Sequence, residues 1–389
     1  MSLCPYNEEL VTLLSNTKFY DTFKFVIIPQ VSENGNRFEL FQEDNQVEIV
    51  CYKSTFLSLF KECHIFLKKF VPDMQFKTYL DTNVNPFSFY QITIGLLLTT
   101  TENKTNINMH SDVFFVLLNK LKSHNERIDF LSKETFIITR LLTCSSNKVN
   151  KSSSLYIWYR KLFILWQGYV SEHTDNKIDK LLLTSKLFID SGKQHFANYY
   201  SWNTSRWIFD NMESLKSKEL FINAIKSFCF QNLSDCSSWD TLSYMICQYK
   251  VRNVYHIKDF DRLKGILVGR ASERKVVWLQ MDLSKLVQNI CNHICRCNIK
   301  TWPPFLCLLR IFSVYSNELT DKISQIKNEW LEDINVFESK FGKIELYNGF
   351  TPVINSGEHD NDYLRNESIL HLGQKLVFLN KLSGKSSVV

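Results

Sequence analysis

The residues of this sequence that could bind a metal gather in one stretch, CNHICRC, at residues 291–297. Cys291 and Cys295 stand one helical turn apart, and His293 lies between them, so thiol and imidazole groups share a short segment. A structural zinc site takes two pairs of ligands, and the sequence offers no second pair. We therefore expect no metal here and interpret Cys291 and Cys295 as small core residues.

A second cluster of reactive side chains lies at residues 195–210, HFANYYSWNTSRWIFD. Phenol, indole and guanidinium groups crowd this segment, with Tyr199, Tyr200, Trp202 and Trp207 inside nine positions. Rings at helical spacing are more often core residues than binding residues. We assign Trp202 to packing, whereas Tyr199 fits either role because it lies about one helical turn before Trp202.

Basic residues are concentrated between positions 250 and 275, where eight Lys or Arg stand against three acids. This stretch carries most of the net charge of +6. It could bind nucleic acid, an acidic protein surface or an anionic membrane. Because it lacks the stacked aromatic residues of single-strand binders, we expect no nucleic acid and interpret it as a solvated loop or an odd helix pair on one face.

The elements that must position these residues are pairs of helices. Glycine (11) and proline (7) are scarce, whereas aromatic residues reach 14%, which favours helices. An amphipathic helix, a polar break and a second helix recur around Trp158, Trp202 and Trp239, and once more with Leu306 in the tryptophan place. The tryptophans lie 44 and then 37 residues apart, the spacing of helix-pair repeats. The sequence predicts an all-α chain, an alpha-alpha superhelix built as a solenoid of helical hairpins.

The N-terminal part departs from this plan. FKFVIIP and RFELF flank Asn34-Gly35, which predicts a small β-hairpin with its turn at these two residues. We divide the chain into an N-terminal segment with the hairpin and a helix (1–75), the helical repeats with the basic insertion 250–275 (76–316), and C-terminal helices with a tail (317–389).

No apolar run reaches the ~20 residues that span a bilayer, and no leader peptide opens the sequence. We therefore expect a cytoplasmic chain without a membrane span. Its eleven cysteines are then reduced thiols.

The repeats resemble those of the protein prenyltransferase alpha subunits, which carry Asn-Tyr, two residues, Trp, two residues and Arg. Asn198, Tyr199 and Trp202 match this pattern, and Trp207 matches the tryptophan that often follows. Ser205 and Lys161 stand where the family has arginine, and Leu306 stands where it has tryptophan. Arg310 keeps the arginine position of that last repeat. The resemblance covers roughly residues 85–315. Within the family, the chain most resembles the alpha subunits of a third type of geranylgeranyltransferase, and we expect it to be a fungal member.

This resemblance implies a heterodimeric protein geranylgeranyltransferase in which a separate beta subunit holds the zinc and the isoprenoid pocket. This chain would need no cofactor of its own and would be inactive without that partner. Tyr199 matches a family tyrosine, Tyr200 replaces a histidine, and the family lysine falls on Ser153, with Lys151 two residues earlier. Since a diphosphate leaving group needs cations or phenols, Tyr199, Tyr200 and Lys151 are expected on the isoprenoid diphosphate side.

The same resemblance assigns the remaining residues and partners. The expected substrates are proteins with a C-terminal cysteine, such as small GTPases or SNARE-like proteins. The residues expected in repeat packing are Trp158, Trp202, Trp207, Trp239, Leu306 and Arg310.

The alternative function is a non-catalytic helical-repeat adaptor derived from that family. The replaced arginines and Leu306 are changes that such a scaffold would tolerate. A nucleic-acid-binding protein is a more distant third.

Overall fold

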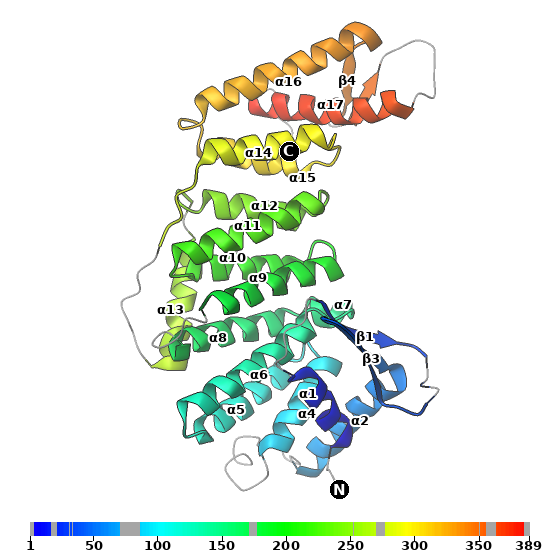
Figure 1. The fold of residues 1–389 in the computed structure, drawn as a ribbon, viewed down its shortest axis with the longest axis vertical. Coiled ribbons are helices and arrows are strands. Elements are labelled where there is room, and N and C mark those ends of the chain that lie inside the picture. The colour runs from blue at the N-terminus through cyan, green and yellow to red at the C-terminus, as the bar shows by residue number, and fades with distance from the viewer. Residues whose placement is uncertain are drawn as a thin grey trace. The chain divides into compact units, whose positions relative to one another are not determined.

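The computed structural model describes residues 4–16, 22–30, 32, 34–70, 86–170, 177–251, 253–269, 277–349, 351–354 and 363–384. It divides into two compact units. Unit 1 comprises residues 1–211 and 255–275, and unit 2 comprises residues 212–254 and 276–389. Helices dominate both units and pair as hairpins (Figure 1). The predicted all-α helical-repeat fold with a small N-terminal β element is confirmed, whereas the three-part domain division stays a prediction.

Unit 1 begins with a short helix and a sheet and continues as helical hairpins. Its strands are β1 (Thr22–Ile28), β2 (Phe38–Glu43) and β3 (Gln46–Tyr52). Its helices are α1 (Pro5–Leu14), α2 (Lys53–Phe70), α4 (Pro86–Thr99), α5 (Lys104–Lys120), α6 (His124–Leu142), α7 (Asn147–Asn150), α8 (Ser153–Val170), α9 (Lys177–Gln194), α10 (Tyr199–Asn211) and α13 (Val254–Val268). The side chains of residues 177–183 lie outside the described residues.

The N-terminal sheet corrects the expected hairpin. The strand order is β1-β3-β2, with β3 antiparallel to β2 and parallel to β1. The tight turn is therefore at Asp44-Asn45, where Asp44 has a φ of 45°, and not at Asn34-Gly35. Too many residues separate β1 from β2 for a two-residue turn, and the two strands pair with opposite edges of β3.

Close helix packing fixes the start of unit 1. Gly95 lies in the middle of α4, where a Cβ would come within 1.7 Å of Asn7 Oδ1 on α1. Only glycine permits this approach. Nearly every residue of α4 is buried, because α1, α2 and α5 all pack on it. This helix is the centre of the N-terminal core.

The hairpin repeats that we expected in unit 1 are present. The helices α4 and α5, α6 and α8, and α9 and α10 each form a pair, and α8 packs on α10 (Figure 1). Ser123 caps α6 with a capping box in which Glu126 completes the second hydrogen bond. Trp158 on α8, and Trp202 and Trp207 on α10, are fully buried between helices.

Within its described residues, the basic stretch contains one helix, α13, which crosses the C-terminal ends of α8 and α10 (Figure 1). Phe260 is fully buried, with its ring centroid 5.6 Å from that of Trp207. Trp207 Nε1 donates to Asp259 Oδ2 at 3.1 Å, and His256 Nδ1 lies 2.6 Å from Asp210 Oδ2. The stretch is thus a packed helix rather than a solvated loop. Residues 252 and 270–275 lie outside the described part.

Unit 2 consists of further hairpins and a C-terminal helix pair joined by a small β-hairpin. Its elements are α11 (Leu215–Gln231), α12 (Cys236–Cys247), α14 (Leu283–Arg296), α15 (Pro303–Val314), α16 (Thr320–Phe341), β4 (Ile344–Tyr347), β5 (Thr351–Ile354) and α17 (Tyr363–Leu382). Trp239 on α12 and Trp330 on α16 are fully buried, and Trp330 packs against Phe378 with ring centroids 4.9 Å apart. The hairpin β4-β5 was not expected from the sequence.

Candidate functional site

Four large side chains are exposed near the N-terminal ends of α8 and α10, two helices of unit 1 that pack on each other. Tyr199 and Tyr200 are 58% and 43% exposed, Phe196 is 61% exposed, and Ile157 on α8 is 53% exposed. The two tyrosine rings meet edge to face, with centroids 5.7 Å apart. We call these four residues the aromatic surface.

The two helices are held together beside this surface by Arg160. Its Nη2 donates to Thr204 Oγ1 at 3.2 Å, and its guanidinium lies 5.3 Å from the centroid of the Trp207 ring. Burial lowers the pKa of Arg160, opposed by the charge of Asp259 and by the Tyr199 phenol nearby. Arg160 follows Ile157 by three positions, about one helical turn along α8.

Of the three residues expected on the diphosphate side, Tyr199 and Tyr200 are in ring contact, and Lys151 contacts the turn before them. Lys151 Nζ donates to the carbonyl of Phe196 at 3.4 Å, three residues before Tyr199. This contact ties Lys151 to the turn that precedes α10, and it goes to the backbone rather than to either phenol. Whether these residues meet an isoprenoid diphosphate stays a prediction.

A buried polar cluster holds α10 in position below the aromatic surface. The amide Nδ2 of Asn198 donates to Asn150 Oδ1 at 2.6 Å and to Ser191 Oγ at 3.0 Å. Asn198 Oδ1 accepts from the backbone N–H of Ser201 at 3.3 Å, as an N-cap side chain does. Ala197 before it has a φ of 51°. Asn198 is thus committed to the fold, while the two tyrosines after it point outward.

The residues that we assigned to repeat packing divide into two groups. Trp158, Trp202, Trp207 and Trp239 are at most 1% exposed. Leu306 is 50% exposed, while Phe305 beside it is fully buried. The physical reason is a shift of one position in helical phase, which turns Leu306 outward on α15.

Arg310, the remaining residue assigned to packing, forms an ion pair that joins α15 to α12. Its Nη1 lies 2.6 Å from Asp240 Oδ1 and 3.4 Å from Ser243 Oγ.

The cysteine stretch lies on α14 and just after it. Cys291 is buried, which raises the pKa of its thiol, whereas Cys295 and Cys297 are exposed. The His293 ring stacks on Phe230 with centroids 4.2 Å apart, and its Nε2 lies 3.1 Å from the Phe230 carbonyl. Within the described ranges no three His, Cys, Asp or Glu side chains gather as a metal site would require.

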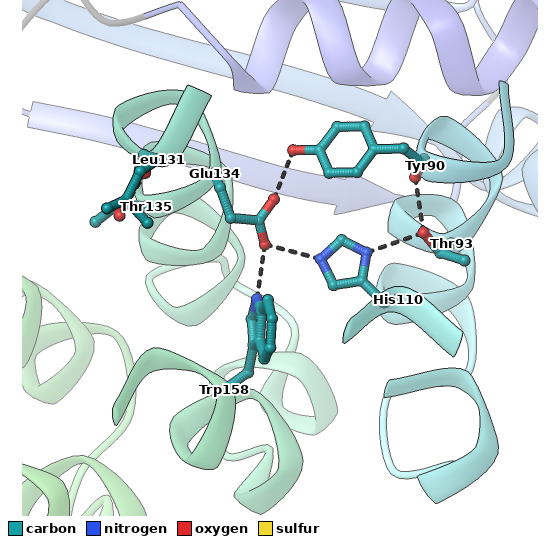
Figure 2. A network of polar contacts seen from close by, with 7 residues as sticks. All are labelled: Tyr90, Thr93, His110, Leu131, Glu134, Thr135 and Trp158. Carbon is teal, nitrogen blue, oxygen red and sulfur yellow. Dashed lines mark hydrogen bonds and ion pairs between the residues drawn. The ribbon is translucent and has the colours of Figure 1, made fainter. Parts of the chain in front are cut away.

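A polar network that the sequence analysis missed lies in the core of unit 1 (Figure 2). Glu134 on α6 is fully buried, and its carboxylate accepts three hydrogen bonds. These come from Tyr90 OH at 2.5 Å, His110 Nε2 at 2.8 Å and Trp158 Nε1 at 2.7 Å. One carboxylate thereby connects α4, α5, α6 and α8.

Thr93, His110 and Glu134 are the residue types of a nucleophilic triad, but their geometry is that of a structural network. Thr93 Oγ1 lies 2.9 Å from His110 Nδ1 and donates to the Tyr90 carbonyl at 2.8 Å. Both ring nitrogens of His110 face oxygen atoms, so a doubly protonated imidazolium satisfies both. Thr93, His110 and Glu134 are each 0% exposed, so no substrate reaches the threonine hydroxyl.

The charge on Glu134 is held in place by its neighbours. Burial raises the pKa of this carboxyl, but the positive His110 and the bonds from His110, Tyr90 and Trp158 outweigh burial, so the pKa lies below its ordinary value of 4.5. Burial and the Glu134 charge raise the pKa of Tyr90 well above its usual range, which keeps the phenol neutral as a donor.

A signal for this network was present in the sequence. Leu131, Ile138 and Leu141 form an apolar stripe along α6, and Glu134 stands on that stripe. An acid on the buried face of a helix needs partners.

In the described part of the chain no helix is both long and apolar enough to cross a bilayer.

Three family models match successive parts of the chain. They are the ECM9 N-terminal domain at residues 2–143, the ECM9 middle domain at residues 155–267 and the ECM9 C-terminal domain at residues 283–388. A curated relative, Protein ECM9 of the yeast Saccharomyces cerevisiae, is 36% identical over 374 residues. That match covers 94% of this chain and 93% of the yeast protein.

These matches correct the family that we inferred from the repeats. The matching models are those of ECM9 proteins and not of protein prenyltransferase alpha subunits, so the expected membership, and with it the terms prenylation and geranylgeranyltransferase, is wrong. Tryptophan-bearing helix pairs indicate stacked hairpins, an architecture that different families share. The expected beta subunit, its zinc, the isoprenoid diphosphate and the protein substrates rested on that resemblance and remain untested.

Proposed function

We propose that this chain, which belongs to the ECM9 family and matches it in its N-terminal, middle and C-terminal parts, is a non-catalytic helical-repeat adaptor. In this proposal a partner protein binds to the aromatic surface of unit 1, formed by Ile157, Phe196, Tyr199 and Tyr200.

The observation that carries the proposal is the exposure of these four large side chains near the N-terminal ends of two helices that pack on each other. Leaving large rings in water costs free energy, roughly 25 cal/mol for each Å² of apolar area, unless a partner covers them. Tyrosine is enriched among the residues that dominate binding energy at protein interfaces. The rigid Asn198 cluster beneath the surface holds it without a partner, so little ordering is needed on binding.

A second observation supports an adaptor over an enzyme. Thr93, His110 and Glu134, which have the residue types for nucleophilic chemistry, are sealed in the core. Next to these side chains, Lys151 donates to a backbone carbonyl and Arg160 to a threonine of the neighbouring helix, so both contacts support the fold.

The proposal is tested by placing a photo-crosslinking amino acid at position 199 or 200 of the full chain in its native host. The control position is Tyr347, which is 67% exposed in unit 2. A discrete adduct from positions 199 and 200, absent from position 347, identifies the partner. That partner is then purified, and its affinity for variants of the full chain is measured by calorimetry.

The substitutions separate surface area from phenol chemistry. Tyr199→Phe with Tyr200→Phe keeps the rings, so the affinity should stay within about two-fold. Tyr199→Ala should weaken binding by roughly 30-fold or more, as expected for a residue that dominates an interface. Equal binding by Tyr199→Ala and the native chain would contradict the proposal, and so would loss of binding in the double Phe variant.

A further inference from the structure

A groove of about 1260 Å³ lies along α15 in unit 2. Its floor is one face of that helix, with Pro303, Leu306, Arg310 and Ser313 recurring every three or four residues. Leu306 is half exposed there. We call this the α15 groove.

The walls of the α15 groove come from three other helices of unit 2. Asp240 and Ser243 lie on α12, Ile323 and Lys327 on α16, and Leu382 at the end of α17. Leu306, Ile323 and Leu382 give the interior an apolar character. Pockets for small molecules are commonly ~300–1,000 Å³ and largely enclosed, whereas this groove is larger and exposes Leu306 and Lys327 to solvent.

The length of the groove suits a helical segment. The floor residues extend along α15 from Pro303 to Ser313. Ten steps of 1.5 Å each make ~15 Å along the helix, which is nearly three helical turns. Protein grooves of this kind take an amphipathic helix whose apolar side chains recur at i, i+3 or i+4, and i+7.

The charge of the groove selects among such helices. Its lining contains three basic side chains, Arg310, Lys327 and Lys381, and one acidic side chain, Asp240. Asp240 is neutralised by its contact with Arg310 at 2.6 Å. The lining therefore carries a positive excess beside its apolar floor, which complements acidic side chains flanking an apolar stripe.

We propose that the α15 groove binds an acidic amphipathic helix of a partner protein. The apolar stripe of that helix lies on Leu306 and Ile323, and its acidic side chains face Lys327. This goes beyond the proposed function because it concerns other residues in the other unit, so either proposal can fail while the other stands.

The test selects peptides from a phage-displayed library of random 16-residue sequences on the full-length chain. Enriched peptides are synthesised, and their binding to the full chain is measured by fluorescence anisotropy. Enrichment should yield apolar residues at helical spacing flanked by Asp or Glu. Leu306→Arg should weaken their binding by roughly 30-fold or more, because it places a charge in the centre of the apolar contact.

Lys327→Glu should weaken binding about ten-fold at low salt and less at 0.5 M salt, because mobile ions screen exposed charges. The matched controls lie on α16 outside the groove lining. Val336→Arg repeats the change made at Leu306 at another half-exposed residue, and Lys340→Glu repeats the charge reversal; both should bind within about two-fold of the native chain.

Four outcomes would overturn the proposal. They are no enrichment, enrichment of peptides without acidic residues, equal binding by Leu306→Arg and the native chain, and loss of self-association of the full chain in Leu306→Arg. The last would assign the groove to a second copy of this chain. Circular dichroism of Leu306→Arg should match the native spectrum, since the side chain already faces solvent.

Discussion

The carboxylate of Glu134 accepts three hydrogen bonds at a place that water does not reach. Replacing it by glutamine keeps the shape but removes the charge that His110 faces. Breaking a buried ion pair by removing one partner costs about 3–5 kcal/mol. We expect Glu134→Gln to lower the free energy of unfolding by about that amount, measured by urea denaturation.

The control for this substitution is an exposed ion pair on the same helix. Asp129 Oδ2 and Lys133 Nζ lie 2.8 Å apart, with side chains 61% and 47% exposed. Asp129→Asn should change the free energy of unfolding by less than ~1 kcal/mol, because water screens such pairs. A similar cost for both substitutions would mean that the Glu134 network adds nothing specific.

The lowered pKa of Glu134 also predicts acid sensitivity. Its contribution to stability is complete above the unfolded value of 4.5 and is lost as pH falls through the lower folded pKa. The comparison is the free energy of unfolding of the native chain and of a Glu134→Gln, His110→Gln variant between pH 5.5 and 3. A histidine in an unfolded chain is already protonated throughout this range, so Glu134 governs the difference. The advantage of the native chain over the variant should shrink below pH 4.5, and a constant difference would contradict the assignment.

At the scale of elements, α13 shows what sequence periodicity cannot predict. The helix pairs could be predicted because a period of 3.6 and a polar break are local properties, visible around Trp158 and Trp239. The docking of α13 depends on the contacts of Asp259 and Phe260 with Trp207. Trp207 lies about fifty residues earlier in the sequence, so these side chains meet only in the folded unit. The parallel pairing of β1 with β3 is non-local in the same way.

The docking of α13 should depend on Phe260. Its ring is fully buried against Trp207, and a Phe→Ala change in a core costs about 3–5 kcal/mol. We expect Phe260→Ala to raise hydrogen exchange in residues 255–268 more than elsewhere in unit 1. Ile266→Ala, at a side chain that is 69% exposed on the same helix, should leave that exchange unchanged. Equal protection in both variants would show that α13 is held by its polar contacts alone.

Across the whole molecule, burial decided which sequence-based assignments could succeed. The four tryptophans lie inside the hairpins, as large rings at helical spacing favour. Tyr199 fitted either role from sequence, because a phenol one turn from a buried tryptophan can face inward or outward. The exposure of Phe196 and Ile157 depends on how α8 and α10 lie side by side, and Leu306 was misplaced by one position of helical phase.

A helical-repeat chain should respond to damage according to distance along the array, because each hairpin contacts mainly its neighbours. Phe89 on α4 is fully buried, with its ring centroid 4.9 Å from that of Phe66 on α2. We expect Phe89→Ala to raise hydrogen exchange most in α2, α4 and α5, and least in α9 and α10 of the same unit. Ile65→Ala, at a residue of α2 that is 68% exposed, is the control and should change none of them. A uniform rise through unit 1 would instead mean that its hairpins unfold in one cooperative step, and the description of this unit as an array of separable repeats would then be wrong.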